Sequence, residues 1–102
     1  MKIYKKLVRD KIPLIIRNSG REAVVKILKE SSYKKALDRK LKEELKEYEK
    51  SKEPEELADM EEVIRSILVS KKISRQKFEK IITEKRKEKG GFSKRIELIS
   101  VK

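Results

Sequence analysis

The most constraining feature of this sequence is a short acidic segment inside a strongly basic chain. Residues 43–62 contain ten Asp/Glu and three Lys, whereas the other 82 residues contain 27 Lys/Arg and eight Asp/Glu. The segment therefore carries a net charge of about −7, and the rest of the chain about +19. This contrast suggests a divalent cation held by carboxylates, next to basic residues that hold a polyphosphate.

The acidic residues repeat at helical spacing in two halves. Glu44 and Glu47 are three positions apart, as are Glu56 and Asp59, so each pair lies on one face of a helix. A short polar stretch between the halves ends in proline, which suits the first turn of a new helix. The sequence therefore predicts an antiparallel helical hairpin.

The register of this hairpin can be read from the residue numbers. Facing residues of an antiparallel pair have position numbers with a roughly constant sum. The sum is 103 both for Glu44 with Asp59 and for Glu47 with Glu56. We therefore expect two pairs of carboxylates to meet across the helix interface at neighbouring levels.

Glu44 also interrupts an apolar stripe. Leu37, Leu41 and Tyr48 flank it at heptad-like spacing, so an apolar residue would be expected in its place. A charged, unpaired acid on an inward stripe costs on the order of several kcal/mol, and a bound cation would relieve that cost. The alternative is a solvated acidic helix face paired with nearby lysines, because such spacings arise by chance in a chain that is 47% charged.

Composition narrows the possible chemistry. The chain contains neither cysteine nor histidine, which excludes disulfides, thiolate or imidazole metal ligands, and histidine-activated nucleophiles. Oxygen ligands remain, and they favour Mg²⁺ or Mn²⁺.

We expect a single domain spanning residues 1–102. A domain of this size buries only a modest core, so a homo-oligomer, a dimer or a tetramer, would help to cover its apolar surface. No apolar run is long enough to span a bilayer, so we expect no membrane association and a cytoplasmic protein.

The remaining pattern predicts a mainly α fold. Helices are expected over residues 11–18, 33–50, 54–71 and 75–88, so that a third helix follows the hairpin. Two β-branched or alternating segments, 23–28 and 94–101, are predicted to form a short two-stranded β element.

Three sequence blocks resemble a known enzyme superfamily. EELKE (43–47) followed by ELAD (56–59) is similar to the EExxE…ExxD signature of the all-α nucleoside triphosphate pyrophosphohydrolases, which include MazG, the phosphoribosyl-ATP pyrophosphohydrolases and dimeric dUTPases. KLVRDKIP (6–13), and KRKEKGGF (85–92) with the KRI that follows, resemble a small MazG-like subgroup described as phosphoribosyl-ATP pyrophosphohydrolase-like. The resemblance covers nearly the whole chain. One departure is the eight-residue gap between the two acidic motifs, which is shorter than is typical of MazG.

The resemblance implies an all-α NTP pyrophosphatase-like bundle that hydrolyses the bond between the α- and β-phosphates of a nucleoside triphosphate, plausibly for nucleotide-pool house-cleaning. It implies that Mg²⁺ is held by Glu44, Glu47, Glu56 and Asp59. Glu43 or Glu47 would orient or deprotonate the attacking water, and the sequence does not separate the two. The candidates for the phosphate clamp are basic residues near both ends of the chain, namely Arg9, Lys11, Lys85, Arg86 and Lys89.

Two other function classes also fit the sequence. The net charge of +12 and the basic stretch 71–89 would suit a nucleic-acid-binding module, although the acidic segment would repel nucleic acid. The other is a helical oligomerisation protein with a degenerate site.

Overall fold

The computed structural model describes all 102 residues and contains four α-helices and no strand. The chain divides into two compact units, Met1–Lys71 and Lys72–Lys102, each described by itself. The first contains α1 (Ile12–Asn18), α2 (Glu30–Ser51) and α3 (Pro54–Ser70), and the second contains α4 (Arg75–Lys89). The mainly α prediction is confirmed, with helix boundaries within three residues of those expected. The expectation of a single domain stays a prediction.

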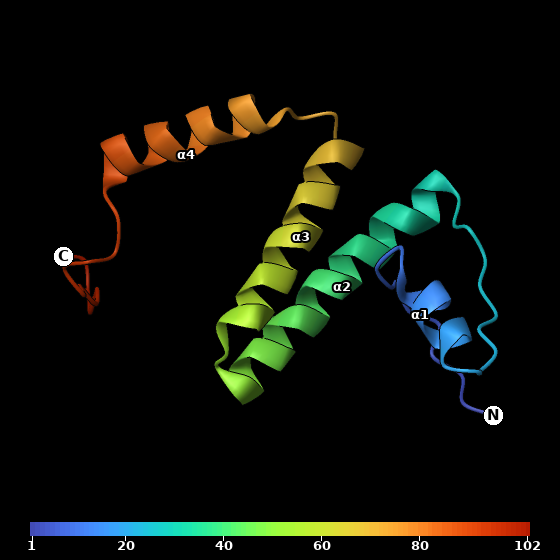
Figure 1. The fold of residues 1–102 in the computed structure, drawn as a ribbon. Coiled ribbons are helices and arrows are strands. Elements are labelled where there is room, and N and C mark those ends of the chain that lie inside the picture. The colour runs from blue at the N-terminus through green and yellow to red at the C-terminus, as the bar shows by residue number, and fades with distance from the viewer. The chain divides into compact units, whose positions relative to one another are not determined.

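The antiparallel hairpin of α2 and α3 is the main packed element of the first unit (Figure 1). Leu37 of α2 is 2% exposed, and Val63 and Leu68 of α3 are each 8% exposed, so apolar stripes of the two helices form the core. The hairpin prediction is confirmed, because each helix is amphipathic and buries its apolar face against the other.

A tight turn joins the two helices. Lys52 ends α2 in the left-handed conformation, with φ of 59°, and its backbone N–H donates to the carbonyl oxygen of Tyr48 at 2.7 Å. Glu53 follows in extended conformation, and its N–H donates to Ser51 Oγ at 3.1 Å. Pro54 then opens α3, where its missing N–H costs no helical hydrogen bond. The chain therefore reverses within two residues.

The N-terminal part of the first unit is less regular. Residues 1–11 form an arm that precedes the short helix α1, in which Pro13 occupies the first turn. Gly20 follows the helix with φ of 86°, a conformation that glycine adopts without steric cost. Beyond it, the Arg17 guanidinium donates to the carbonyl oxygen of Ala23 at 2.9 Å and ties the following loop back to the helix.

The second unit consists of one helix and a tail without helix or strand. Ser74 caps α4, because its Oγ accepts a hydrogen bond from the Lys77 N–H at 3.1 Å. No residue of α4 is buried. The tail after Gly90 is exposed throughout.

The predicted β element is wrong, since neither 23–28 nor 94–101 forms a strand. A strand is stable only when its backbone groups pair with a neighbour and one face packs on a core. Val24 and Ile27 are 97% and 95% exposed, and Leu98 and Ile99 are 76% and 82% exposed. These segments have the β-branched and apolar composition of strands, but they neither pair with a neighbour nor pack on a core, so no strand forms.

None of the helices is both long enough and apolar enough to cross a membrane.

The hairpin core gives a direct test of this packing. Leu37→Ala should lower the free energy of unfolding by about 2–5 kcal/mol, because it removes a fully packed side chain and leaves a cavity. Leu45→Ala is the matched control on the same helix, and it should cost less than about 1 kcal/mol because Leu45 is 45% exposed. Urea unfolding followed by circular dichroism measures both. Equal losses would contradict the assigned orientation of α2.

Candidate metal centre on the helical hairpin

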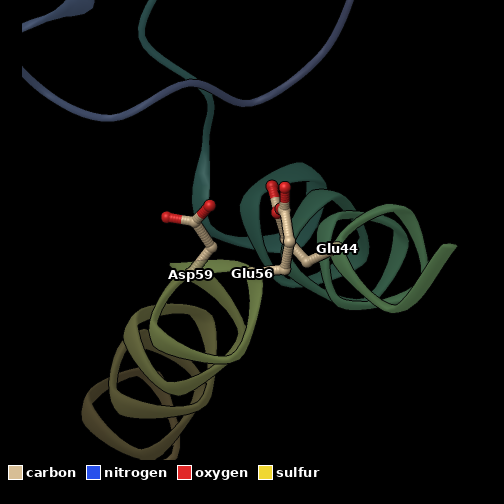
Figure 2. Close-up of side chains that lie close together, drawn as sticks. All are labelled: Glu44, Glu56 and Asp59. Carbon is tan, nitrogen blue, oxygen red and sulfur yellow. The ribbon is translucent and has the colours of Figure 1, made fainter. Parts of the chain in front are cut away.

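Three carboxylates converge where α2 and α3 face each other. Glu44 comes from α2, and Glu56 and Asp59 come from the first two turns of α3. One oxygen from each lies within 4.8 Å of the others. Figure 2 shows the three side chains projecting to the same side of the hairpin, toward the N-terminal arm. The helical i, i+3 spacing of the two α3 acids places both on the face that meets Glu44.

Glu44 is the buried member of this group. The residue is 8% exposed and occupies the inward position that the apolar stripe predicts. Its Oε1 lies 3.3 Å from the Nζ atom of Lys40, one helical turn earlier, and the Lys40 side chain is itself only 16% exposed. This lysine offsets part of the cost of burying the carboxylate. A single ammonium group cannot offset the charge of three neighbouring carboxylates.

The neighbouring carboxylates affect the pKa of Glu56. Partial removal from water and the negative charges of Asp59, Glu44, Glu47 and Glu55, in that order, raise the pKa of the Glu56 carboxyl above its ordinary value. Glu56 lies in the first turn of α3, where the helix dipole favours a negative charge. The pKa is raised despite that dipole, so the cluster holds an excess of negative charge that a cation would relieve.

The N-terminal arm supplies cations to the edge of the cluster. Arg9 Nη2 lies 2.8 Å from Asp59 Oδ1, and Lys6 Nζ lies 3.3 Å from Glu43 Oε1. The Arg9 and Asp59 side chains are 54% and 38% exposed, and ion pairs this accessible to water contribute about 0–1 kcal/mol. The arm is therefore held to both helices by contacts that are individually weak.

The group of three carboxylates contains part of the predicted set of four acids. Glu44 faces both acids of α3, whereas Glu47 is exposed and lies outside the group of three. Glu47 still acts on the group, because its charge contributes to the raised pKa of Glu56. Glu43 points its carboxylate to Lys6 and Lys40. Glu44 meets Asp59 as the constant sum predicts, and it also reaches Glu56 because a glutamate side chain spans more than one level of the interface.

The predicted phosphate-binding residues fall into two groups. Arg9 lies at the carboxylates, and Lys11 is exposed at the start of α1. The others, Lys85, Arg86 and Lys89, are exposed on the last turns of α4 in the second unit. Their participation in a site with the hairpin stays a prediction.

Two basic residues at the acidic cluster were not identified from the sequence. Lys40 is three and four positions before Glu43 and Glu44, a spacing that signals ion pairs along one helix face. Lys6 is three positions before Arg9 and contacts α2 across 37 residues of sequence. No local sequence rule could have paired Lys6 with its acid.

The donor set fits a hard divalent cation. Mg²⁺ and Mn²⁺ take carboxylate oxygens as ligands, and the chain offers no thiol or imidazole that would favour a softer metal. Glu44, Glu56 and Asp59 could together hold such an ion, with Glu47 close enough to interact electrostatically. Carboxylates that hold a metal in this way leave further coordination positions for water or phosphate oxygens.

Comparisons with known proteins do not assign this site to a family. No protein-family model matches the sequence, and no solved structure matches it. An uncharacterized protein of Mycolicibacterium smegmatis is 54% identical over 41 residues, which is 40% of this chain and 42% of that protein. The matched segment thus spans less than half of either chain. The function of the site therefore rests on its geometry and chemistry.

The raised pKa of Glu56 predicts a pH-dependent gain in stability when its charge is removed. A carboxyl whose pKa is raised by folding opposes folding when ionised, and this penalty disappears as pH falls through the raised pKa. Without divalent ions, Glu56→Gln should therefore raise the melting temperature at pH 7, and the gain should vanish below the ordinary value of 4.5.

Glu55→Gln is the matched control for this measurement. Glu55 is the exposed neighbour in the same helical turn, so its replacement removes the same charge and the same interaction with the helix dipole. Its effect should be smaller than that of Glu56→Gln, because Glu55 makes the smallest of the charge contributions to the raised pKa of Glu56. Equal gains from both substitutions would show that the clustering of carboxylates is not the cause.

Proposed function

We propose that this protein is a nucleoside triphosphate pyrophosphohydrolase that depends on Mg²⁺ or Mn²⁺ and converts NTP or dNTP to NMP and pyrophosphate. The observation that most supports this is the convergence of Glu44, Glu56 and Asp59 from two helices, with Arg9 at their edge. A carboxylate-held cation beside a guanidinium group is suited to a substrate that carries several phosphates. The resemblance of the acidic motifs to the MazG-like superfamily supports the same activity.

Each group has a chemical role in the proposed reaction. Glu44, Glu56 and Asp59 would hold a divalent ion, which would supply positive charge to offset the charge that develops on the phosphate oxygens. Water attacks the α-phosphorus, a new P–O bond forms, the bond from the α-phosphorus to the bridging oxygen breaks, and pyrophosphate leaves. Arg9 and Lys11 would hold the phosphate oxygens, and a contribution from Lys85, Arg86 and Lys89 of α4 stays a prediction.

Glu47 is the better candidate for the residue that orients the water and takes its proton. It is exposed, and it is close enough to the metal-binding group to influence Glu56. Glu43 also lies at this end of α2, but Lys6 and Lys40 engage its carboxylate. Because two ammonium groups already contact the Glu43 carboxylate, it is less free to accept a hydrogen bond from the water.

The proposal includes the all-α NTP pyrophosphatase-like fold, a cytoplasmic house-cleaning role and a homo-oligomer. The helical hairpin supports the first of these. The oligomer is supported by large apolar side chains that remain in water, including Val24, Ile27 and Phe92, which are 95–97% exposed. A second copy would give these side chains something to pack against.

A basic nucleic-acid-binding module is the second candidate. Residues 72–102 contain eleven Lys/Arg and four Asp/Glu, and α4 exposes Arg86, Lys87 and Lys89 in its last turn. Binding that comes from this charge alone would be independent of nucleotide sequence and would fall steeply with salt.

The test is pyrophosphate release from a panel of canonical and damaged nucleoside triphosphates in Mg²⁺. Glu47→Gln should lower kcat by about 10²- to 10⁴-fold, because it removes the group that accepts the proton of the water. Glu49→Gln is the matched control, since Glu49 is an exposed acid on the same helix, and it should leave turnover close to that of the native chain.

The possible results separate the parts of the proposal. Turnover that survives Glu47→Gln would overturn the role given to that residue and leave the activity standing. Absence of release across the panel, in Mn²⁺ as well as Mg²⁺, would overturn the enzyme. Retention on nucleic acid that declines with salt would then favour the binding module.

A further inference from the structure

The N-terminal arm contacts the acidic cluster where a cation would be expected. Arg9 Nη2 lies 2.8 Å from Asp59 Oδ1 across 50 residues of sequence, and Lys6 binds Glu43 on the other helix. Figure 2 shows a backbone segment in the blue of the N-terminus crossing the side to which the three carboxylates project. The guanidinium group of Arg9 therefore neutralises part of the negative charge of this cluster.

Arg9 and a divalent ion would compete for the same carboxylate. Asp59 is one of the three acids that could hold the ion, and a second cation 2.8 Å from its oxygen repels the incoming one. Both partners of the ion pair are at least a third exposed, so water screens the pair and it breaks at little cost. The contact weakens metal binding without preventing it.

A guanidinium displaced from Asp59 would remain at the edge of the site. A polyphosphate chelated by the metal must place its oxygens beside the carboxylates that hold that metal. Arg9 would then be within reach of these oxygens, and its planar fork of donors matches phosphate as well as carboxylate. Arg9 can thus pair either with the Asp59 carboxylate or with a phosphate oxygen.

We infer that Arg9 is a partner-exchanging specificity residue: it pairs with Asp59 when the site is free of metal and with a phosphate oxygen when a metal–polyphosphate complex is bound. This inference rests on the proposed function, since it assumes a metal at the carboxylates and a phosphate ligand. As a consequence, the site binds the metal–polyphosphate complex in preference to the free ion. The free ion must compete with Arg9 for Asp59, whereas the complex gains a contact with Arg9. Binding of ion and polyphosphate is then mutually reinforcing.

Removal of Arg9 should have opposite effects on the two ligands. Arg9→Ala should tighten binding of Mn²⁺ alone by about two- to fivefold, which corresponds to the loss of an exposed ion pair. The same variant should weaken binding of Mn²⁺ with imidodiphosphate, a polyphosphate that resists hydrolysis, by about tenfold or more, because a charge-assisted contact is lost. Isothermal titration calorimetry measures both on the full chain.

Two further variants complete the experiment. Lys2→Ala removes one positive charge from the same arm, and the Lys2 side chain lies over the Tyr4 ring, so both affinities should stay near native values. Arg9→Lys keeps the charge and loses the fork, so it should retain competition with Mn²⁺ while binding the complex less tightly. Helicity and melting temperature without metal verify that each variant is folded.

The sign of the effect on Mn²⁺ alone decides the inference. If Arg9 only fastens the arm to the hairpin, its loss should weaken or leave unchanged the binding of both ligands, and either result overturns the exchange. Native protein that binds Mn²⁺ but not imidodiphosphate would also overturn it. Failure of native protein to bind Mn²⁺ overturns the metal site and the exchange together, whereas absence of NTP hydrolysis with the opposite shifts intact would overturn only the enzyme.

Discussion

The packing of α2 against α3 is the interaction on which the rest of the structure depends. Leu37, Val63 and Leu68 bury their side chains at this interface, and the two-residue turn after α2 fixes how the helices face each other. The same packing carries Glu44 inward and brings Glu56 and Asp59 to it. The hydrophobic contacts thus supply the free energy that holds like charges together, which carboxylates alone would oppose.

Two ion pairs offset the negative charge of this site, and they differ in how far water reaches them. Lys40 lies on the same helix as Glu44 and is largely buried, so the pair forms whenever α2 forms and contributes to the resting site. Arg9 reaches Asp59 from a separate segment, and water has access to both partners. The Lys40–Glu44 pair lowers the cost of burying the Glu44 carboxylate. The Arg9–Asp59 pair is weak, because water screens it. The two pairs therefore differ in how firmly they offset the charge of the carboxylates.

The second unit shows why local pattern and final structure can disagree. Ser74 caps α4 as its sequence signals, because a cap needs only its own first turn. The alternating apolar tail from residue 94 forms no strand, because pairing requires a neighbour that propensity cannot provide. Exposed apolar side chains in the tail and in the loop after α1 mark surface that this chain leaves uncovered.

The sequence by itself determined the four helices, the hairpin and the inward position of Glu44, because helical periodicity, caps and the proline after the turn act over a few residues. It also limited any metal to oxygen ligands, because the chain contains no cysteine or histidine. Only the tertiary structure decided that three carboxylates form one group without Glu47, and that Arg9 reaches Asp59 from 50 residues away. The carboxylate group depends on how far the side chains reach, and the Arg9–Asp59 contact depends on how distant segments pack. The spacing of residues along one helix determines neither of these.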